Sequence, residues 1–259
     1  MERMVGKSNP PNTFIFAGAN ASGKSTYIAH LLEHKIIYGE YINPDLILKE
    51  ELRLDETLEN YLKAFEIADK KREDAIKHKR DMIIETVFST QSKIDLVKKL
   101  KETGYNVTLF FTATESSDIN VLYLKNRVEN GGHDVPIKKL LDRRERGFKN
   151  IKEAIDNNLI DCIIFTDNSI IGQPPQIIKS LYKQKICFIN DNFNRDITWI
   201  DKVVDRDIGI VDDVDWELVE CIQIQKNIID KNNKFKEILL KSYDDKNRIL
   251  LNKRKNNDR

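Results

Sequence analysis

The chain has 259 residues, of which 43 are basic and 42 acidic, so its formal net charge is +1. This balance produces no overall field that would select nucleic acid. No apolar stretch approaches the roughly 20 residues needed to cross a bilayer, and the first residues carry no secretory hydrophobic segment. We therefore expect a cytoplasmic protein that has neither a membrane nor a nucleic acid as its partner.

The chain carries three widely spaced cysteines, Cys162, Cys187 and Cys221. An odd number at such spacing favours reduced thiols over a disulfide framework or a zinc site, particularly in the cytoplasm. We expect all three to be free thiols that pack in the interior.

Apolar β-branched runs alternate with helical periodicity along the chain, which predicts an α/β fold in which helices cover a parallel sheet. The predicted strands are residues 13–17, 37–43, 82–88, 106–112 and 162–166, and the predicted helices are residues 58–77, 93–101 and 119–128. Gly104 and Gly131 are expected to end the second and third of these helices. Residues 1–185 are expected to form the main domain. Residues 186–259 are expected to form a partly helical C-terminal extension of unknown function, which includes a possible strand at 186–189 and an acidic loop at 201–215.

Residues 18–25 read G-A-N-A-S-G-K-S and match the phosphate-loop pattern G-x-x-x-x-G-K-[ST]. A predicted strand precedes them and an amphipathic run follows, which is the order that this loop requires. Its backbone N–H groups surround phosphate oxygens, Lys24 neutralises the β- and γ-phosphates, and the Ser25 hydroxyl ligates Mg²⁺. The pattern predicts binding of ATP or GTP. The expected nucleotide-binding residues are Gly18, Ala19, Asn20, Ala21, Ser22, Gly23, Lys24, Ser25 and Thr26.

Two carboxylates follow apolar segments further along the chain. Asp45 ends the segment Y-I-N-P-D, where it is expected to face the phosphate loop and reach a substrate hydroxyl, to cap the helix that begins there, or to do both. The residues alone favour neither interpretation. Glu85 lies within the apolar strand 82–88, where an isolated charge is costly unless it is paired or used, and we favour use.

Arginines surround a glycine turn at residues 131–132. Arg127 precedes this turn, and Arg143, Arg144 and Arg146 follow it on a predicted helix. Such a pattern is typical of a lid that closes over phosphates, because the guanidinium fork binds two phosphoryl oxygens at once. The alternative is an ordinary basic surface helix. His133 in the turn either contacts phosphate or shapes the turn.

Taken together, the motifs A-G-A-N-A-S-G-K-S-T, I-N-P-D, E-T-V-F-S, N-R-V-E-N-G-G-H-D-V-P, R-R-E-R-G-F-K-N and T-D-N-S resemble the zeta-toxin family in order and spacing, from residue 13 to about residue 169. The resemblance implies a P-loop kinase core that transfers the γ-phosphate of ATP to the 3′-hydroxyl of the amino sugar in UDP-N-acetylglucosamine. It also implies that a sugar nucleotide is the substrate and that an antitoxin protein is a partner. It fades past about residue 199.

Carried over by position, the resemblance makes Asp45 the general base for the acceptor hydroxyl. Glu85 and Thr86 would bind the substrate. The residues expected to act on the phosphates are Lys24, Arg127, Arg143 and Arg146, and Arg143 and Arg144 exchange roles if the register shifts by one residue.

A phosphate loop by itself also occurs in ATPases and nucleotide-dependent switches that bind a protein or a nucleic acid. We find no strand that ends in the apolar-Asp-Glu pattern of many ATPases, which argues against this alternative. ATP turnover without any acceptor would favour it. A third possibility keeps the kinase chemistry and changes the acceptor to a polynucleotide end or another metabolite, and its only support is the basic tail at residues 253–255.

Overall fold

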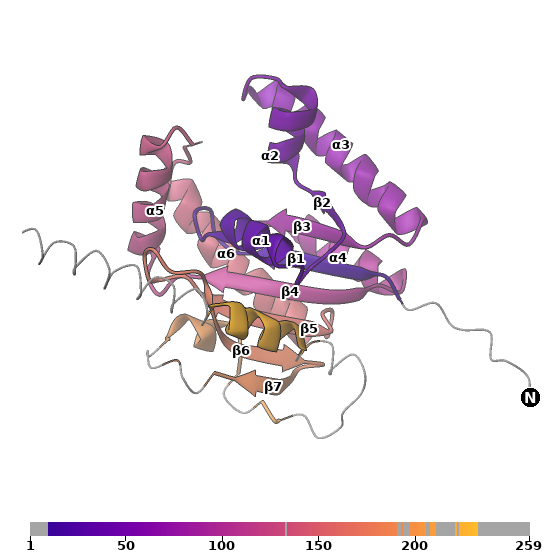
Figure 1. The fold of residues 1–259 in the computed structure, drawn as a ribbon, viewed down its shortest axis with the longest axis vertical. Coiled ribbons are helices and arrows are strands. Elements are labelled where there is room, and N and C mark those ends of the chain that lie inside the picture. Colours follow the sequence, from indigo (N-terminus) through magenta and orange to yellow (C-terminus); the bar gives the residue numbers. More distant parts are fainter. Residues whose placement is uncertain are drawn as a thin grey trace, which may run out of the picture.

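A seven-stranded sheet forms the centre of the computed structural model, which describes residues 10–132, 134–190, 193, 197–205, 208–210, 221 and 223–232 (Figure 1). The strands are β1 (Asn12–Ala17), β2 (Glu40–Ile42), β3 (Met82–Thr86), β4 (Asn106–Ala113), β5 (Cys162–Asp167), β6 (Gln176–Tyr182) and β7 (Lys185–Ile189). Their spatial order is β2-β3-β1-β4-β5-β6-β7. Strands β1 to β5 pair in parallel, whereas β6 and β7 add an antiparallel edge. The predicted α/β fold is confirmed; at the antiparallel edge, the possible strand at 186–189 is present as β7, whereas β6 was not predicted.

The α-helices connect and cover these strands. They are α1 (Lys24–Glu33), α2 (Pro44–Leu46), α3 (Leu58–Lys77), α4 (Gln91–Glu102), α5 (Ser117–Glu129) and α6 (Ile137–Asp156). A π-helical segment, Ile47–Leu52, continues α2, and a 3₁₀ helix, Trp199–Lys202, follows β7. Gly104 and Gly131 follow α4 and α5 with φ angles of 79° and 78°. These angles favour glycine, so the helices end as predicted.

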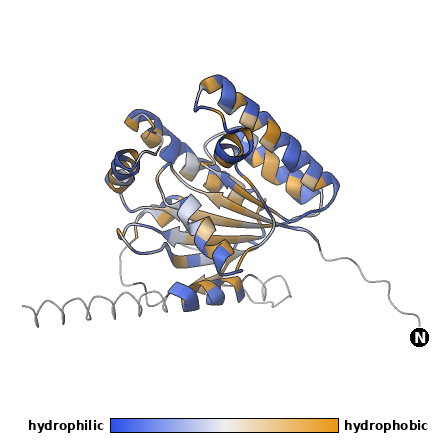
Figure 2. Ribbon diagram, turned by 45° about the horizontal axis from the view of Figure 1, so that its top comes forward, coloured by the Kyte–Doolittle hydropathy of each residue, from blue (hydrophilic) through white to orange (hydrophobic). Residues whose placement is uncertain are grey.

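Alternate residues of β1 point to opposite faces of the sheet, as the strand pleat requires. Phe14 and Phe16 belong to an apolar cluster that includes Tyr27 of α1. Ile15 and Ala17 belong to the larger cluster on the other face, to which α3, α4 and α6 contribute. Figure 2 shows the strands as a mainly hydrophobic layer between these helices. The phosphate loop therefore begins at the end of β1, in the most buried part of the sheet.

Cys162 and Cys221 form a disulfide, with Cα atoms 6.5 Å apart and a sequence separation of 59. The expectation of three reduced thiols is therefore wrong for this pair, and Cys187 is the free cysteine among the described residues. Helical residues 223–232 pack Ile224 and Ile228 on the same sheet face as α1. This packing brings Cys221 to the start of β5, which sequence spacing does not reveal.

Trp199 lies in the larger cluster, on the face of the sheet that α6 covers. Its ring centroid is 5.6 Å from that of Phe111, 6.1 Å from that of Phe148 and 6.3 Å from that of Phe165. Residues 206–207 and 211–215 of the predicted acidic loop, the tail beyond residue 232 and His133 lie outside the described residues. No helix among the described residues is both long enough and apolar enough to cross a membrane.

Candidate active site

The predicted phosphate loop lies between β1 and α1, and its glycines allow close backbone approaches. Gly18 has a φ of 149° and Gly23 a φ of 87°. A Cβ atom on Gly18 would lie 2.1 Å from the backbone oxygen of Thr112, and one on Gly23 would lie 2.3 Å from Nδ2 of Asn168. Helix α1 begins directly after Gly23, so its unpaired N–H groups and positive dipole end face the loop. This arrangement suits a bound phosphate.

Lys24 is only 6% exposed, and its Nζ donates a hydrogen bond to the carbonyl oxygen of Ala19 at 2.8 Å. Burial lowers the pKa of Lys24, and Arg127 lowers it further, whereas the charges of Glu85 and Asp45 oppose this shift. The phosphate-binding lysine is therefore within electrostatic reach of both predicted carboxylates and of one predicted arginine.

Glu85 lies at the end of β3, where its backbone pairs with Phe16 next to the phosphate loop. Its Oε1 accepts a hydrogen bond from the Ser25 hydroxyl at 2.8 Å. Its Oε2 accepts hydrogen bonds from the Tyr41 hydroxyl at 2.5 Å and from Asn43 Nδ2 at 3.0 Å. Burial and the neighbouring Glu85 charge raise the pKa of Tyr41, which keeps its hydroxyl a donor. Glu85 is thus a paired carboxylate that is connected to the loop.

Asn43, not Asp45, caps helix α2. The Asn43 side-chain oxygen accepts a hydrogen bond from the backbone N–H of Asp45 at 2.8 Å, and Pro44 occupies the first helical turn, where its missing N–H costs nothing. The interpretation of Asp45 as the helix cap is therefore wrong. The Asp45 side chain is exposed and lines the cavity described next.

A cavity of about 1000 Å³ extends from the phosphate loop across the carboxyl ends of the strands. Its volume is in the range of ligand pockets. The predicted site residues that line it are Asn20, Ala21, Ser22, Gly23, Lys24, Ser25, Thr26, Asp45, Glu85, Thr86, Arg127 and Arg143. Gly18, Ala19 and Arg146 do not line it, although Gly18 and Ala19 shape the loop. Thr86 also accepts a hydrogen bond from the backbone N–H of Phe88 through its hydroxyl at 3.0 Å.

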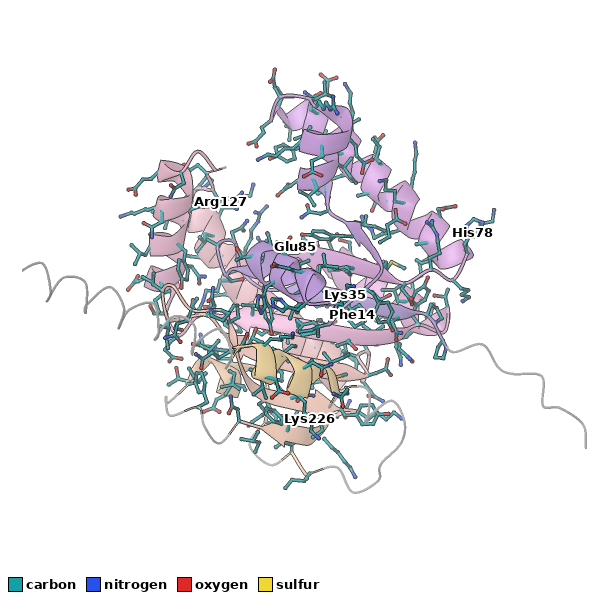
Figure 3. The ribbon with its side chains drawn as sticks, in the orientation of Figure 1. Phe14, Lys35, His78, Glu85, Arg127 and Lys226 are labelled. Carbon is teal, nitrogen blue, oxygen red and sulfur yellow. A yellow bond between two sulfur atoms is a disulfide. The ribbon has the colours of Figure 1, made fainter. Side chains whose placement is uncertain are left out.

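Arginines from α5 and α6 contribute to this cavity. Figure 3 shows Arg127 on α5, with Glu85 at the upper edge of the sheet below it. Arg143 Nη1 donates a hydrogen bond to Asn20 Oδ1 at 3.2 Å, which connects α6 to the phosphate loop. Burial and the neighbouring Arg146 lower the pKa of Arg143. The Arg146 side chain is exposed.

Arg144 has a different environment from its neighbour Arg143. It is 8% exposed, its Nη2 donates to the carbonyl oxygen of Thr114 at 2.7 Å, and its guanidinium lies over the Phe148 ring at 4.8 Å. Arg144 therefore packs against β4 and α6. Of the two adjacent arginines, Arg143 is the one that lines the cavity.

Several residues around the cavity were not predicted. Asn168 follows β5 and donates a hydrogen bond from Nδ2 to the carbonyl oxygen of Ser22 at 3.0 Å. Its position directly after a buried strand is a signal that the sequence carries. Tyr123, Arg72 and Lys93 also line the cavity, and no sequence motif marks them.

A phosphate loop between a parallel strand and a helix, a carboxylate on the adjacent strand and arginines across the cavity together define a nucleotide-binding protein of the P-loop kinase class. The family model described as Zeta toxin matches residues 2–172. The chain belongs to this family, as the sequence motifs predicted. Comparison with functionally curated proteins finds no match.

Solved structures share the fold. A chain of the PezAT chromosomal toxin-antitoxin system of Streptococcus pneumoniae superposes with a TM-score of 0.51 at 14% identity, and the match covers 88% of each chain. A chain of the AvrRxo1-ORF1:AvrRxo1-ORF2 complex with sulphate ions gives a TM-score of 0.55 at 15% identity. The corresponding complex with ATP gives 0.54 at 15% identity. Both of these matches cover 86% of this chain and 76% of the other.

Proposed function

We propose that this protein is an ATP-dependent kinase that phosphorylates a hydroxyl of a sugar nucleotide, namely the 3′-hydroxyl of the amino sugar in UDP-N-acetylglucosamine. One observation carries this proposal. The carboxylate of Asp45 and the ammonium of Lys24 belong to one cavity, and the charge of Asp45 acts on Lys24. A proton acceptor is thereby brought close to a cation that binds the transferred phosphate.

ATP is the proposed phosphoryl donor, and Mg²⁺ is the ion proposed to bind with it. The phosphate loop supports ATP as the nucleotide, and so does the ATP present in the related AvrRxo1 complex. The Ser25 hydroxyl and the Glu85 carboxylate, 2.8 Å apart, are oxygen donors of the kind that Mg²⁺ prefers, so these residues fit the ion. When bound, Mg²⁺ neutralises charge on the β- and γ-phosphates.

In the proposed reaction, Asp45 accepts the proton of the acceptor hydroxyl while the hydroxyl oxygen forms a bond to the γ-phosphorus. The bond from this phosphorus to the β–γ bridging oxygen breaks, and ADP leaves with that electron pair. Lys24, Arg127 and Arg143 stabilise the phosphoryl oxygens. Glu85 and Thr86 hold the acceptor. The protein supplies positioning and charge, and it forms no covalent intermediate.

We further propose that the chain acts as the toxin of a toxin-antitoxin pair. The family assignment and the related PezAT system support this role. The proposed catalytic groups all belong to residues 1–185, and part of residues 186–259 packs against the same sheet.

The proposal is tested by incubating the purified protein with Mg²⁺-ATP and UDP-N-acetylglucosamine and analysing the nucleotide sugars by mass spectrometry. We expect a product heavier by one phosphoryl group. Its rate of formation should fall by a factor of about 10² to 10⁴ in Asp45→Asn, which removes the base but keeps the side-chain shape.

Asp142→Asn is the matched control, because Asp142 is exposed on α6 and does not line the cavity. It should retain the wild-type rate. If ATP is consumed without a phosphorylated sugar nucleotide and Asp45→Asn changes nothing, the kinase proposal is wrong and a nucleotide-dependent switch is favoured.

A further inference from the structure

A helical segment well beyond the family match packs beside the phosphate-loop helix. Residues 223–232, here called the C-terminal helix, place their isoleucines on the sheet face that carries α1. Ser180 of β6 donates a hydrogen bond from Oγ to Gln225 Oε1 at 2.9 Å, and both residues are fully buried. Figure 3 shows Lys226 of this helix below α1 and Glu85 above it. The C-terminal helix is therefore fixed to the β6 side of α1, away from β3 and Glu85.

The last described residue of this helix, Asn232, connects it to the cavity wall. Asn232 is 6% exposed, and its Nδ2 donates a hydrogen bond to the carbonyl oxygen of Pro175 at 3.1 Å. Pro175 lines the cavity together with Gly172, Gln173 and Pro174. The backbone of this short stretch, residues 172–175, is thereby held by a side chain that does not itself line the cavity.

Asn232 also lies beside His30 of α1, which lines the same cavity. His30 Nε2 and Asn232 Oδ1 are both buried, and neither has a hydrogen-bond partner among the described residues. Burial and the neighbouring His34 lower the pKa of His30, whereas Glu33 and Asn232 oppose this shift. Asn232 is therefore close enough to act on His30. Because a buried polar atom without a partner is costly, the two atoms favour a contact with each other.

The wall formed by His30 and residues 172–175 lies on the side of the cavity that suits the nucleoside part of ATP. Asp45 follows β2 at one edge of the sheet, whereas residues 172–175 follow β5, on the other side of β1. With the phosphates at Lys24 and the γ-phosphate toward Asp45, the nucleoside extends toward β5. His30 follows Lys24 by six residues on α1, which is about 9 Å along the helix axis. Imidazole and proline rings offer flat, largely apolar surfaces for a ribose or a base.

We propose that Asn232 is a positioning residue of the nucleotide site, which holds residues 172–175 and His30 together as the wall against which the nucleoside of ATP packs. The C-terminal helix then belongs to the donor site, although it lies outside the region that the family model matches. Asn232 acts through Pro175 and His30 and does not touch the nucleotide. This inference rests on the proposed use of ATP as the donor and is independent of the acceptor.

The test compares two probes by titration calorimetry in the presence of Mg²⁺. One is a non-hydrolysable ATP analogue, and the other is tripolyphosphate, which carries the phosphate chain without a nucleoside. We expect Asn232→Leu to weaken binding of the ATP analogue about fivefold to tenfold, as the loss of one buried hydrogen bond would. Binding of tripolyphosphate should stay at the wild-type level, because the phosphate loop is untouched. A substitution that merely disrupted the fold would weaken both probes.

Asn227→Leu is the matched control, since Asn227 is exposed on the same helix and does not line the cavity. It should bind both probes like the wild type. His30→Ala should also weaken the ATP analogue selectively. Combined with Asn232→Leu, it should cost less than the product of the two single effects, because both residues act on one wall.

The inference is wrong if Asn232→Leu binds the ATP analogue like the wild type, or if it loses affinity for both probes equally. It fails separately from the proposed reaction. Asn232-dependent binding of the ATP analogue without phosphoryl transfer to UDP-N-acetylglucosamine would retain the wall and reject the reaction. Phosphoryl transfer with equal KM for ATP in the wild type and in Asn232→Leu would retain the reaction and reject the wall.

Discussion

The Asn43 side chain holds together the part of the site around Asp45 and Glu85 through its hydrogen bonds. Its side-chain oxygen accepts from the Asp45 N–H, and its Nδ2 donates to both Glu85 and the Tyr41 hydroxyl. One amide therefore connects the first turn of α2 to the end of β3. Because this amide caps the helix, the Asp45 carboxylate is not needed as the cap, and its position is fixed through the backbone.

At the residue scale, the two arginines predicted to act as a pair are expected to differ. Arg143 lines the cavity and contacts Asn20, whereas Arg146 is exposed outside it. Removing a donor that stabilises transition-state charge costs a factor of about 10² to 10³ in kcat. We expect this loss for Arg143→Ala and only a small change for Arg146→Ala, measured as kcat with ATP and the acceptor.

Nucleotide binding serves as the control, because both variants should bind the ATP analogue nearly as well as the wild type. Equal losses of kcat in the two variants would contradict this expectation and would mean that α6 changes its orientation when substrates bind.

Residue patterns predicted part of this site, and packing decides the rest. The phosphate loop, Asp45, Glu85 and Arg127 stand in short motifs whose spacing carries their chemistry. Arg143 and Arg144 were interchangeable in the sequence, because only the position of Phe148 and Thr114 determines which guanidinium is buried. Arg72 and Lys93 were missed because, in a sequence, a helical charge that lines a cavity looks the same as one that faces solvent.

The reactivity of the free Cys187 thiol depends on pH, and the surroundings of this residue determine that dependence. Burial raises its pKa to about 11 from an ordinary value of 9.0. Alkylation requires the thiolate, so its rate should rise with pH up to about 11 and should be about 100-fold lower at pH 8 than for a thiol with an unshifted pKa. Iodoacetamide labelling without reductant, followed by mass spectrometry, measures this rate.

Denaturant provides the control for this experiment, because the unfolded chain should lose the shift and label rapidly at pH 8. A labelling rate in the folded protein that already levels off near pH 9 would show that the thiol is accessible and unperturbed.

Helices and strands differ in how clearly the sequence predicts them. Helix α3, Leu58–Lys77, was predicted with its observed bounds because its 20 residues repeat the apolar period over several turns. Strand β6, Gln176–Tyr182, was missed. Its buried residues come in adjacent runs of two and three rather than alternating. Its identity as a strand depends on pairing with β5, which is a tertiary contact.

The phosphate loop as an element depends on one close backbone approach. Gly18→Ala places a Cβ within 2.1 Å of the Thr112 carbonyl oxygen at a φ of 149°, whereas Gly104→Ala meets nothing within 4 Å at a φ of 79°. In the Gly104 variant the free energy of unfolding should fall only by the cost of a left-handed backbone, about 1–2 kcal/mol. The Gly18 variant should lose more free energy of unfolding and also its affinity for ATP, as measured by urea unfolding and calorimetry.

The comparison between the two glycines is the control, since both substitutions strain φ and only one creates a clash. If Gly18→Ala binds ATP normally and is no less stable than Gly104→Ala, the loop does not require the close approach to β4.

At the scale of the whole molecule, the disulfide closes a long loop across the sheet. It joins β5 to residue 221 over 59 residues, and a loop of this length loses enough unfolded-state entropy to stabilise the fold by up to about 4 kcal/mol. Cys221→Ser should lower the free energy of unfolding by an amount of this order. Urea unfolding with and without reductant measures the effect.

Reductant should destabilise the wild type as much as the substitution does, and it should have no further effect on Cys221→Ser. If reductant leaves the wild-type unfolding curve unchanged, the two thiols are not joined in solution.

Trp199 determines when the kinase core becomes complete during synthesis. Its ring packs against aromatic residues from β4, α6 and β5, although it lies 27 residues past the end of the family match at residue 172. Domains fold as their residues leave the ribosome. The phosphate loop, Asp45 and the arginines all emerge before this tryptophan does. We therefore expect the nascent chain to carry every proposed catalytic group before it has a closed core, so that phosphoryl transfer begins only late in translation.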